Sequence, residues 1–265
     1  MSSSRSGEIP HLVIQLLLGV LVCLLALGLV RLIAPFTVHR DGDYTLLAGH
    51  EIAYPCMGTF YARHDGDVVL VGVAHCYGGD GSRIADGSGR LVGTFGPLAT
   101  FAPCDAADHR CLASDMTYIT LEPDRIPWGR LDTVIMGRTG PRSIAGTHAL
   151  ACGDIAVGDT IEVTGVLGYR EGRVLETGPY LNATDGDHFP CMIVTDARAV
   201  VGDSGGPVLL DGMPAGITSR SFSGLLAFTP LAEGLEALGL ELCTSPDCGL
   251  EPPGTAVPAS STPAP

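Results

Sequence analysis

Charged residues are scarce in this 265-residue sequence, and positive charge is the scarcer kind. Asp, Glu, Lys and Arg make up only 17% of the residues, and 15 Lys and Arg stand against 29 Asp and Glu, for a net charge of −14. A protein that binds nucleic acid needs a basic face to displace counterions. The composition therefore argues against a nucleic-acid partner.

The sequence also lacks metal-binding patterns. It has no tight Cys-x-x-Cys pair and no Cys/His cluster at zinc spacing. Three Asp-Gly-Asp triplets, at 41–43, 65–67 and 185–187, do not continue into the ligand spacing of a calcium loop, so we interpret them as turns. No metal and no other cofactor is expected.

Cysteine itself is abundant, with nine in the chain, which is a high count for a reducing cytosol. Cys23 lies in an N-terminal apolar run, and the other eight all follow that run. These eight are Cys56, Cys76, Cys104, Cys111, Cys152, Cys191, Cys243 and Cys248. An even set on one side of a membrane segment indicates four disulfides in an oxidising, extracytoplasmic compartment.

The apolar run from Leu12 to Val30 would span about 28 Å as a helix, close to the thickness of a bilayer core. A cleaved signal peptide is the alternative, but no small-x-small cleavage site is evident before Pro35. We therefore expect an N-terminal tail at 1–10, a transmembrane signal-anchor helix at 11–33 and a spacer at 34–43.

Long helical periodicity is missing from the rest of the chain until Leu231 to Leu240. Between Tyr44 and Leu242 there are instead short alternating segments separated by turns, in a sequence with 36 Gly and 19 Pro. This pattern predicts an all-β domain of antiparallel barrels with one late helix. The Pro/Ala/Ser/Thr-rich stretch at 250–265 is expected to be a disordered tail.

The most informative stretch is Gly202-Asp203-Ser204-Gly205-Gly206-Pro207. A nucleophilic serine needs its Oγ exposed on a tight turn, with backbone N–H groups directed at the developing oxyanion. Flanking glycines permit that turn and a close approach of the substrate backbone. The alternative is a glycine-rich hairpin loop with an idle serine.

This hexapeptide resembles the nucleophile motif of trypsin-like serine peptidases. The wider stretch from Thr195 to Leu209 is similar to the bacterial HtrA/DegP branch, which typically has Asn where this chain has Asp203. The resemblance implies two six-stranded antiparallel barrels of the chymotrypsin type with a C-terminal helix, over 44–249. It also implies that Gly202 and Ser204 supply the oxyanion-hole N–H groups.

The general base implied by the resemblance is His75. Val73-Ala74-His75-Cys76 resembles the Ala-His-Cys signature of the family, and the segment from Cys56 to Phe60 is similar to the one that supplies the partner of that cysteine. The resemblance thus implies a Cys56–Cys76 bridge. Cys104–Cys111, Cys243–Cys248 and Cys152–Cys191 are candidate bridges, but eight cysteines permit 105 pairings.

The acid is expected to be Asp115, which stands just before the alternating segment from Met116 to Leu121, as in the family. A buried carboxylate there can accept a hydrogen bond from the imidazole. Its rivals lie in polar, turn-like stretches: Asp105, Asp108, Asp124 and Asp132. The order His, Asp, Ser matches the chymotrypsin-like arrangement.

Activation by N-terminal cleavage is not expected, because no Arg-Ile-Val-Gly-Gly-like site precedes Cys56. Asp203 then needs another partner, since an unpaired buried carboxylate is costly. Secreted bacterial relatives use an internal arginine for this purpose. Arg138, Arg142 and Arg173 are the candidates.

Candidate substrate-binding residues lie on both sides of the serine. Arg198, six residues before Ser204, would favour acidic side chains if it lined the specificity pocket, and the alternative is that it points to solvent. The segment Thr218-Ser219-Arg220-Ser221 is the expected edge for pairing with a substrate backbone, with Thr218, Ser219 and Ser221 as contact residues.

These observations predict a membrane-anchored serine endopeptidase that hydrolyses polypeptides through an acyl-enzyme. Its catalytic domain is expected outside the cytoplasm, in a bacterial cell envelope or on the extracellular side. The alternative is a catalytically quiet protease-fold module that binds a peptide or a partner. Hydrolysis of small esters would use the same residues.

Overall fold

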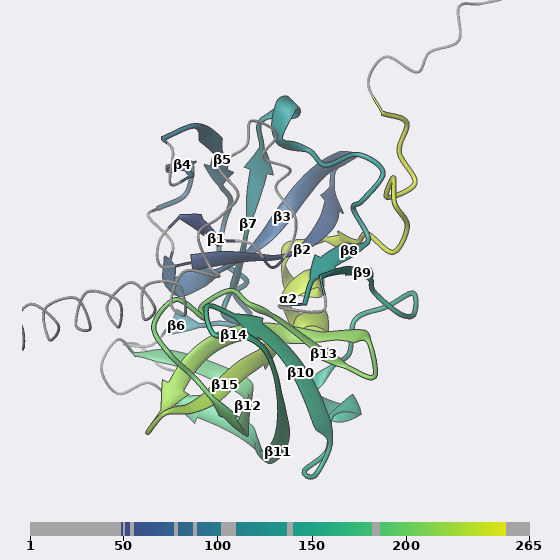
Figure 1. Cartoon of the computed structure of the whole chain (residues 1–265). Helices are drawn as coiled ribbons and strands as arrows, with labels where there is room; N and C mark the ends of the chain where they lie inside the picture. Colours follow the sequence, from purple (N-terminus) through teal and green to yellow (C-terminus); the bar gives the residue numbers. More distant parts are fainter. Residues whose placement is uncertain are drawn as a thin grey trace, which may run out of the picture. The chain divides into compact units, whose positions relative to one another are not determined.

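The computed structural model (Figure 1) describes residues 49, 51–53, 56–76, 79–86, 89–101, 110–136, 140–181 and 186–252. The chain divides into two units, 1–44 and 45–265, and all described residues belong to the second. The expected tail, membrane helix and spacer at 1–43 lie outside the described residues, as do residues 253–265 of the expected C-terminal tail. Within the described ranges, no helix is long and apolar enough to cross a membrane.

Strands dominate the described chain, as the alternating segments predict. The strands are β1 Glu51–Ala53, β2 Cys56–His64, β3 Asp67–Val73, β4 Arg83–Ala85, β5 Leu91–Phe95, β6 Arg110–Cys111, β7 Met116–Leu121, β8 Thr133–Ile135, β9 Pro141–Ser143, β10 Thr160–Gly165, β11 Gly168–Leu181, β12 Asp187–Arg198, β13 Pro207–Leu210, β14 Met213–Phe222, β15 Leu225–Pro230 and β16 Glu241–Leu242. The helices are the 3-10 turns η2 Ala74–Cys76, η3 Pro123–Arg125 and η5 Cys152–Asp154, and the α-helix α2 Leu231–Leu238.

The first sheet has the strand order β1-β2-β3-β7-β5-β4, and β16 also pairs with β2, at Ala62 and Arg63. β3 and β7 occupy its centre, and all but one residue of each strand is buried. Leu70 and Ile119 are cross-strand partners in this antiparallel pair, and both are buried. The paired and buried centre of these two strands therefore holds the residues at their ends in place.

The second sheet has the order β11-β10-β13-β14-β15-β12-β6. β11 also pairs with β12, and this pairing closes the six strands β10 to β15 into a barrel. Alternate residues of these strands fill the interior, among them Ile161, Val163, Ile193 and Phe228, all fully buried. This period of two is the one expected for strands with a single buried face.

The structure confirms one of the two expected barrels and adds one strand pairing to the expected fold. The sequence predicts two closed, antiparallel six-stranded barrels, but among the described residues only the second sheet closes. β1 and β4, which end the first sheet, approach each other without pairing, and each is only three residues long. In addition, β6 joins β12 in parallel. The all-β architecture with one C-terminal helix is confirmed.

The helix α2 contacts both sheets, packing against β7 and β14 (Figure 1). Leu231, Leu235 and Leu238 are its buried apolar residues and join the core of the first sheet. The spacing of these leucines is that of one helical face. Asp115 directly precedes β7, and β14 carries Thr218, Ser219 and Ser221, so α2 packs against both strands that position these candidate site residues.

Disulfide bonds are confirmed. Three bridges join described residues: Cys56–Cys76, Cys152–Cys191 and Cys243–Cys248. Cys111 is disulfide-bonded as well, and its expected partner Cys104 lies outside the described residues. The bridges link positions 5, 20 and 39 residues apart. Each lowers the conformational entropy of the unfolded chain, and the effect grows with the length of the closed loop.

Candidate active site

The three residues that the sequence places in a triad come from the ends of different strands. His75 lies in η2 directly after β3, and Asp115 directly precedes β7. Because β3 and β7 are antiparallel neighbours with Val73 opposite Met116, the end of one strand adjoins the start of the other. Ser204 lies in the turn between β12 and β13, in the second sheet. The site therefore sits where the two sheets meet.

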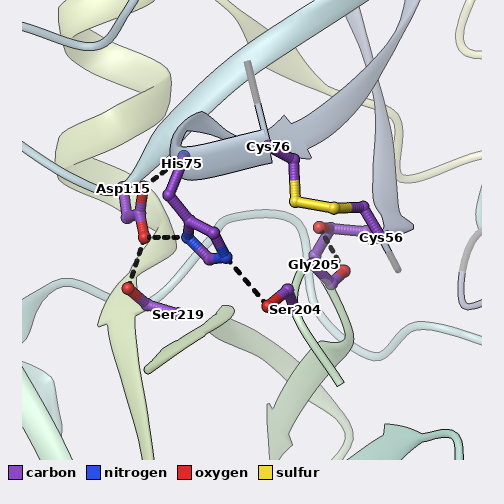
Figure 2. Close-up of a disulfide and its surroundings, with 8 residues drawn as sticks. Cys56, His75, Cys76, Asp115, Ser204, Gly205 and Ser219 are labelled. Carbon is purple, nitrogen blue, oxygen red and sulfur yellow. Dashed lines mark hydrogen bonds and ion pairs between the residues drawn. A yellow bond between two sulfur atoms is a disulfide. The ribbon is translucent and has the colours of Figure 1, made fainter. Parts of the chain in front are cut away.

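His75 and Asp115 make two contacts with each other (Figure 2). The imidazole Nδ1 lies 2.8 Å from the carboxylate Oδ2, and the backbone N–H of His75 donates to Oδ1 at 3.0 Å. The backbone N–H of Ala74 also donates to the carbonyl oxygen of Asp115, at 2.9 Å. These three hydrogen bonds to Asp115, one from the ring and two from the backbone of η2, hold the imidazole in one orientation.

Asp115 is fully buried and surrounded by donors. The hydroxyl of Ser219 donates to Oδ2 (Figure 2), and the backbone N–H of Asp115 donates to Thr229 Oγ1 at 3.1 Å. Burial raises the pKa of this carboxyl. The hydrogen bond from His75 and its electrostatic attraction, the hydrogen bond from the Ser219 hydroxyl and the charge of Arg220 together outweigh that effect, so the pKa lies below its ordinary value.

Ser204 completes a continuous chain of contacts. Its Oγ lies 2.8 Å from Nε2 of His75, on the side of the ring opposite to Asp115 (Figure 2). Such a chain lets the imidazole accept the hydroxyl proton while the carboxylate stabilises the resulting imidazolium. This arrangement is able to generate a nucleophilic serine oxygen.

The loop that carries Ser204 is fastened to neighbouring strands through its backbone. The Ser204 carbonyl accepts from the N–H of Met57 at 2.8 Å, and the Gly205 N–H donates to the Thr218 carbonyl at 2.8 Å. Gly205 has φ 83°, and a Cβ added there would lie 2.2 Å from the Met57 carbonyl oxygen. Only glycine fits this close approach to β2.

Two backbone donors next to the serine oxygen remain available. The N–H groups of Gly202 and Ser204 have no acceptor within the described part of the chain. These are the two groups that the sequence resemblance assigns to an oxyanion hole. A pair of uncommitted N–H groups beside a nucleophile can bind the negative oxygen of a tetrahedral intermediate.

Asp203, between these two donors, is buried and held from three directions. Oδ1 accepts from the N–H of Val166 and Oδ2 from the N–H of Val200, each at 2.9 Å. The guanidinium of Arg170 lies 3.0 Å from Oδ2. Within the described residues, no side-chain nitrogen of Arg170 forms a well-aligned hydrogen bond, so the pair acts mainly through charge.

The partner of Asp203 differs from the three expected arginines. Arg142 pairs with Glu162 at 2.6 Å, and the backbone N–H of Arg173 donates to Asp196. Arg138 lies outside the described residues. The turn between β10 and β11 brings Arg170 next to Asp203. Gly165, at the end of β10, lies so close to the loop of Ser204 that an added Cβ would be 2.0 Å from the Asp203 carboxylate. No pattern in the sequence indicates that Arg170 lies next to Asp203.

A cavity of about 180 Å³ opens beside Ser204. Its lining residues are Ala199, Val200, Val201, Gly202, Asp203, Ser204, Thr218, Ser219, Arg220 and Ser221. The expected substrate edge at 218–221 thus forms one wall. Arg198 is not part of this lining and is exposed at the end of β12, in accord with the alternative that it points to solvent.

Strand β14 has one edge that is incompletely paired. It pairs with β15 from Gly216 to Phe222, whereas its pairing with β13 ends at Ile217. The Thr218 N–H still donates to the Gly206 carbonyl, at 2.9 Å. Among the described strands, none pairs with this side of β14 beyond that point. An extended peptide can add to such an edge.

Two functional contacts were missed at the sequence level. Ser219 was expected to act through its backbone, but its hydroxyl also holds Asp115. Thr229 binds the backbone of Asp115 and accepts from Ser114 Oγ at 2.9 Å, although no sequence motif marks it. As for metals, no group of three or more His, Cys, Asp or Glu suited to an ion occurs among the described residues.

Comparison with known proteins identifies the fold. No family model matches the sequence, and no curated protein matches it. Among solved structures, protease A of Thermobifida fusca is 23% identical with a TM-score of 0.57, over 76% of this chain and 99% of that one. A glutamic-acid-specific serine protease that uses a histidine triad in substrate binding is 23% identical with a TM-score of 0.58, over 74% and 99%.

A third structure agrees with these two. Chymotrypsin of Cellulomonas bogoriensis is 20% identical with a TM-score of 0.56, over 76% of this chain and 99% of that one. Nearly the whole of each bacterial protease is therefore matched, although few of its residues are shared. This chain has the fold of the trypsin- and chymotrypsin-like serine proteases.

Proposed function

We propose that this chain is a serine endopeptidase with Ser204 as nucleophile, His75 as general base and Asp115 as orienting acid. The observation that carries the proposal is the unbroken chain of contacts from Asp115 Oδ2 through the imidazole to Ser204 Oγ, at 2.8 Å for each step. Each atom in that chain has the role that acyl transfer requires of it.

The reaction proceeds in two halves. Ser204 Oγ attacks the peptide carbonyl carbon while its proton passes to Nε2 of His75, and the carbonyl oxygen becomes negative and accepts from the N–H groups of Gly202 and Ser204. The intermediate collapses as His75 returns the proton to the leaving amine. Water, deprotonated by His75, then attacks the acyl-enzyme, and the acid product leaves as Ser204 regains its proton.

A polypeptide substrate is supported by the incompletely paired edge of β14 next to the cavity. A peptide that adds to this edge would run past Ser204 with one side chain directed into the cavity. Backbone pairing makes no demand on sequence, so the edge favours a peptide over a small ester. No cofactor takes part in this scheme.

Activity without N-terminal cleavage belongs to the same proposal. In digestive relatives a newly formed N-terminus pairs with the Asp that precedes the serine. Here the charge of Arg170 and two backbone N–H groups already hold Asp203. A loop held in this way needs no new terminus to keep the Gly202 and Ser204 donors in position.

The cellular setting of the proposal is the outer side of a membrane. The seven disulfide-bonded cysteines support an oxidising compartment. The apolar run at 11–33 would anchor the chain, in a bacterial cell envelope or on the extracellular side. The catalytic domain would then act on polypeptides outside the cytoplasm.

An activity-based probe tests the enzyme proposal directly. The purified, oxidised full chain is treated with a fluorophosphonate and compared with Ser204→Ala and with Ser143→Ala, which removes an exposed hydroxyl in β9. We expect labelling of the unmodified chain and of Ser143→Ala, but not of Ser204→Ala. Absence of labelling in a folded sample would favour the quiet peptide-binding module, and equal labelling of all three chains would exclude Ser204.

A further inference from the structure

Strand β14 has an irregular pairing directly beside the proposed triad. Thr218 and Arg220 are two residues apart, but their partners on β15 are adjacent residues. Ser219, between them, is therefore the extra residue of a β-bulge. A bulge turns a side chain out of the regular alternation of a strand. In this position the hydroxyl of Ser219 donates to Oδ2 of Asp115 (Figure 2).

Arg220 follows the bulge and is attached to the first residues of β12. Its guanidinium donates to Oδ2 of Asp187 at 3.1 Å, and its Cζ lies 5.4 Å from the centre of the Phe189 ring. Both of these β12 residues are buried, and they lie on one face of the strand because they are two residues apart. Arg220 thus joins the bulge of β14 to the start of β12 by an ion pair and by contact with an aromatic ring.

The start of β12 is attached in turn to the segment that leads into Asp115. β6 pairs in parallel with the first two residues of β12, and the backbone N–H of Leu112 donates to the carbonyl oxygen of His188 at 2.9 Å. Leu112 stands three residues before Asp115, and the two residues between them are buried. The contacts therefore form a closed ring. Asp115 accepts from Ser219, Arg220 follows Ser219, and Arg220 binds the strand that holds the segment before Asp115.

The charge of Arg220 acts on Asp115 in the same direction as this ring of contacts. Burial raises the pKa of the Asp115 carboxyl. Its hydrogen bonds with His75 and Ser219 lower that pKa, and so does the positive charge of Arg220. Arg220 therefore favours the ionised carboxylate that orients the imidazole.

We propose that Arg220 is a positioning residue for acyl transfer at this site, and that it acts through Asp115. The inference rests on the proposed peptidase function. The route is indirect: the guanidinium fixes the bulge, the bulge directs the hydroxyl of Ser219, and that hydroxyl holds the carboxylate that orients His75.

A double-mutant cycle tests this route. The rate of fluorophosphonate labelling is measured for the full chain, for Arg220→Met, for Asp115→Asn and for the variant with both changes. We expect Arg220→Met to slow labelling about tenfold, the factor that corresponds to one hydrogen bond to a charged group. In the Asp115→Asn background the same change should slow labelling less than about twofold, because the two residues act on one group. A residue that acts only on the fold would slow both backgrounds by the same factor.

Three further variants accompany the cycle. Arg220→Lys keeps a positive charge beside Asp187 and should retain most of the labelling rate. Arg142→Met removes the same type of side chain from its ion pair with Glu162 and should leave the rate unchanged. Because Arg220→Met leaves the buried Asp187 without this cation, it is also combined with Asp187→Asn, which removes both charges. This combined variant should fold and should show the same loss of rate as Arg220→Met.

The outcomes separate this inference from the proposal on which it rests. Labelling that depends on Ser204 but not on Arg220, or that loses the same factor in the Asp115→Asn background, overturns the role of Arg220 and leaves the peptidase standing. A full rate in the variant that lacks both charges does the same, and so does an Arg220→Lys rate no higher than that of Arg220→Met. A chain that does not react with the fluorophosphonate overturns both.

Discussion

The two sheets hold their parts of the site by different means. The first sheet presents His75 and Asp115 through side-chain hydrogen bonds between neighbouring strand ends, with Cys56–Cys76 next to the histidine. The second sheet presents Ser204 on a loop fastened by backbone hydrogen bonds and by the buried pair of Arg170 and Asp203. His75 and Asp115 are thus positioned by adjacent strands, whereas Ser204 is positioned by a loop whose conformation depends on its contacts with neighbouring residues.

This difference separates two kinds of requirement. The contacts of Asp115 set the orientation and charge of the imidazole, so their loss should affect the chemical step more than the fold. The contacts of Asp203 set the path of the loop and the direction of the Gly202 and Ser204 donors, so their loss should affect both stability and activity. The following variants test that division.

The largest expected effect is that of Asp115→Asn. An amide keeps the size of the carboxylate but holds the imidazole in the wrong tautomer and does not stabilise the imidazolium, so kcat should fall about 10⁴-fold. Steady-state cleavage of a peptide substrate measures it. Asp124→Asn is the matched control, because that side chain is 71% exposed and, among the described residues, forms one ion pair, with Arg90 at 3.4 Å. If Asp115→Asn retained a tenth of the activity, Asp115 would not be the acid.

Arg170→Met comes next and acts on the other side of the site. It leaves the buried Asp203 without its positive partner, which should lower the free energy of unfolding by about 3 kcal/mol. It should also lower kcat/KM about a hundredfold, as expected when an oxyanion donor moves. Denaturant unfolding and peptide cleavage measure the two effects.

Two further variants sharpen this result. Arg142→Met removes the same type of side chain from a partly exposed pair with Glu162, so it should change stability by less than about 1 kcal/mol. Adding Asp203→Asn to Arg170→Met removes the unpaired charge and should restore part of the stability. Full activity of Arg170→Met would show that the loop does not depend on this pair.

The smallest effect concerns pH. The pKa of Asp115 is lowered in the folded protein, so its ionised form contributes stability that is fully present above the unfolded pKa, about 3.9. That contribution is lost as the pH falls through the folded pKa. The stability difference between the unmodified chain and Asp115→Asn should therefore shrink below about pH 4. Unfolding measured between pH 7 and pH 3 tests this, and a constant difference would contradict it.

Much of the site was accessible from the sequence because the information is local. Glycines around Ser204, the strand before His75 and the strand after Asp115 each lie within a few residues of the side chain they position. The all-β class followed from short alternating segments in the same way. A pattern that repeats every two residues is visible without knowing which strand pairs with which.

The residues that the sequence did not identify act across long distances along the chain. Arg170 and Asp203 are brought together by the turn after β10, and Ser219 reaches Asp115 across 104 residues. The closure of the second sheet and the parallel pairing of β6 also depend on how distant strands meet. No local pattern encodes such contacts, since each partner alone is an ordinary arginine, serine or strand.

The sequence by itself determined that this is a disulfide-bonded, acidic, all-β chain with a reactive-serine motif. That much depends on composition and on spacings of a few residues. Only the tertiary structure decided which arginine holds Asp203 and that Arg198 stands outside the cavity. The physical reason is that charge pairing, burial and cavity shape depend on distances in space, which the order of residues along the chain does not contain.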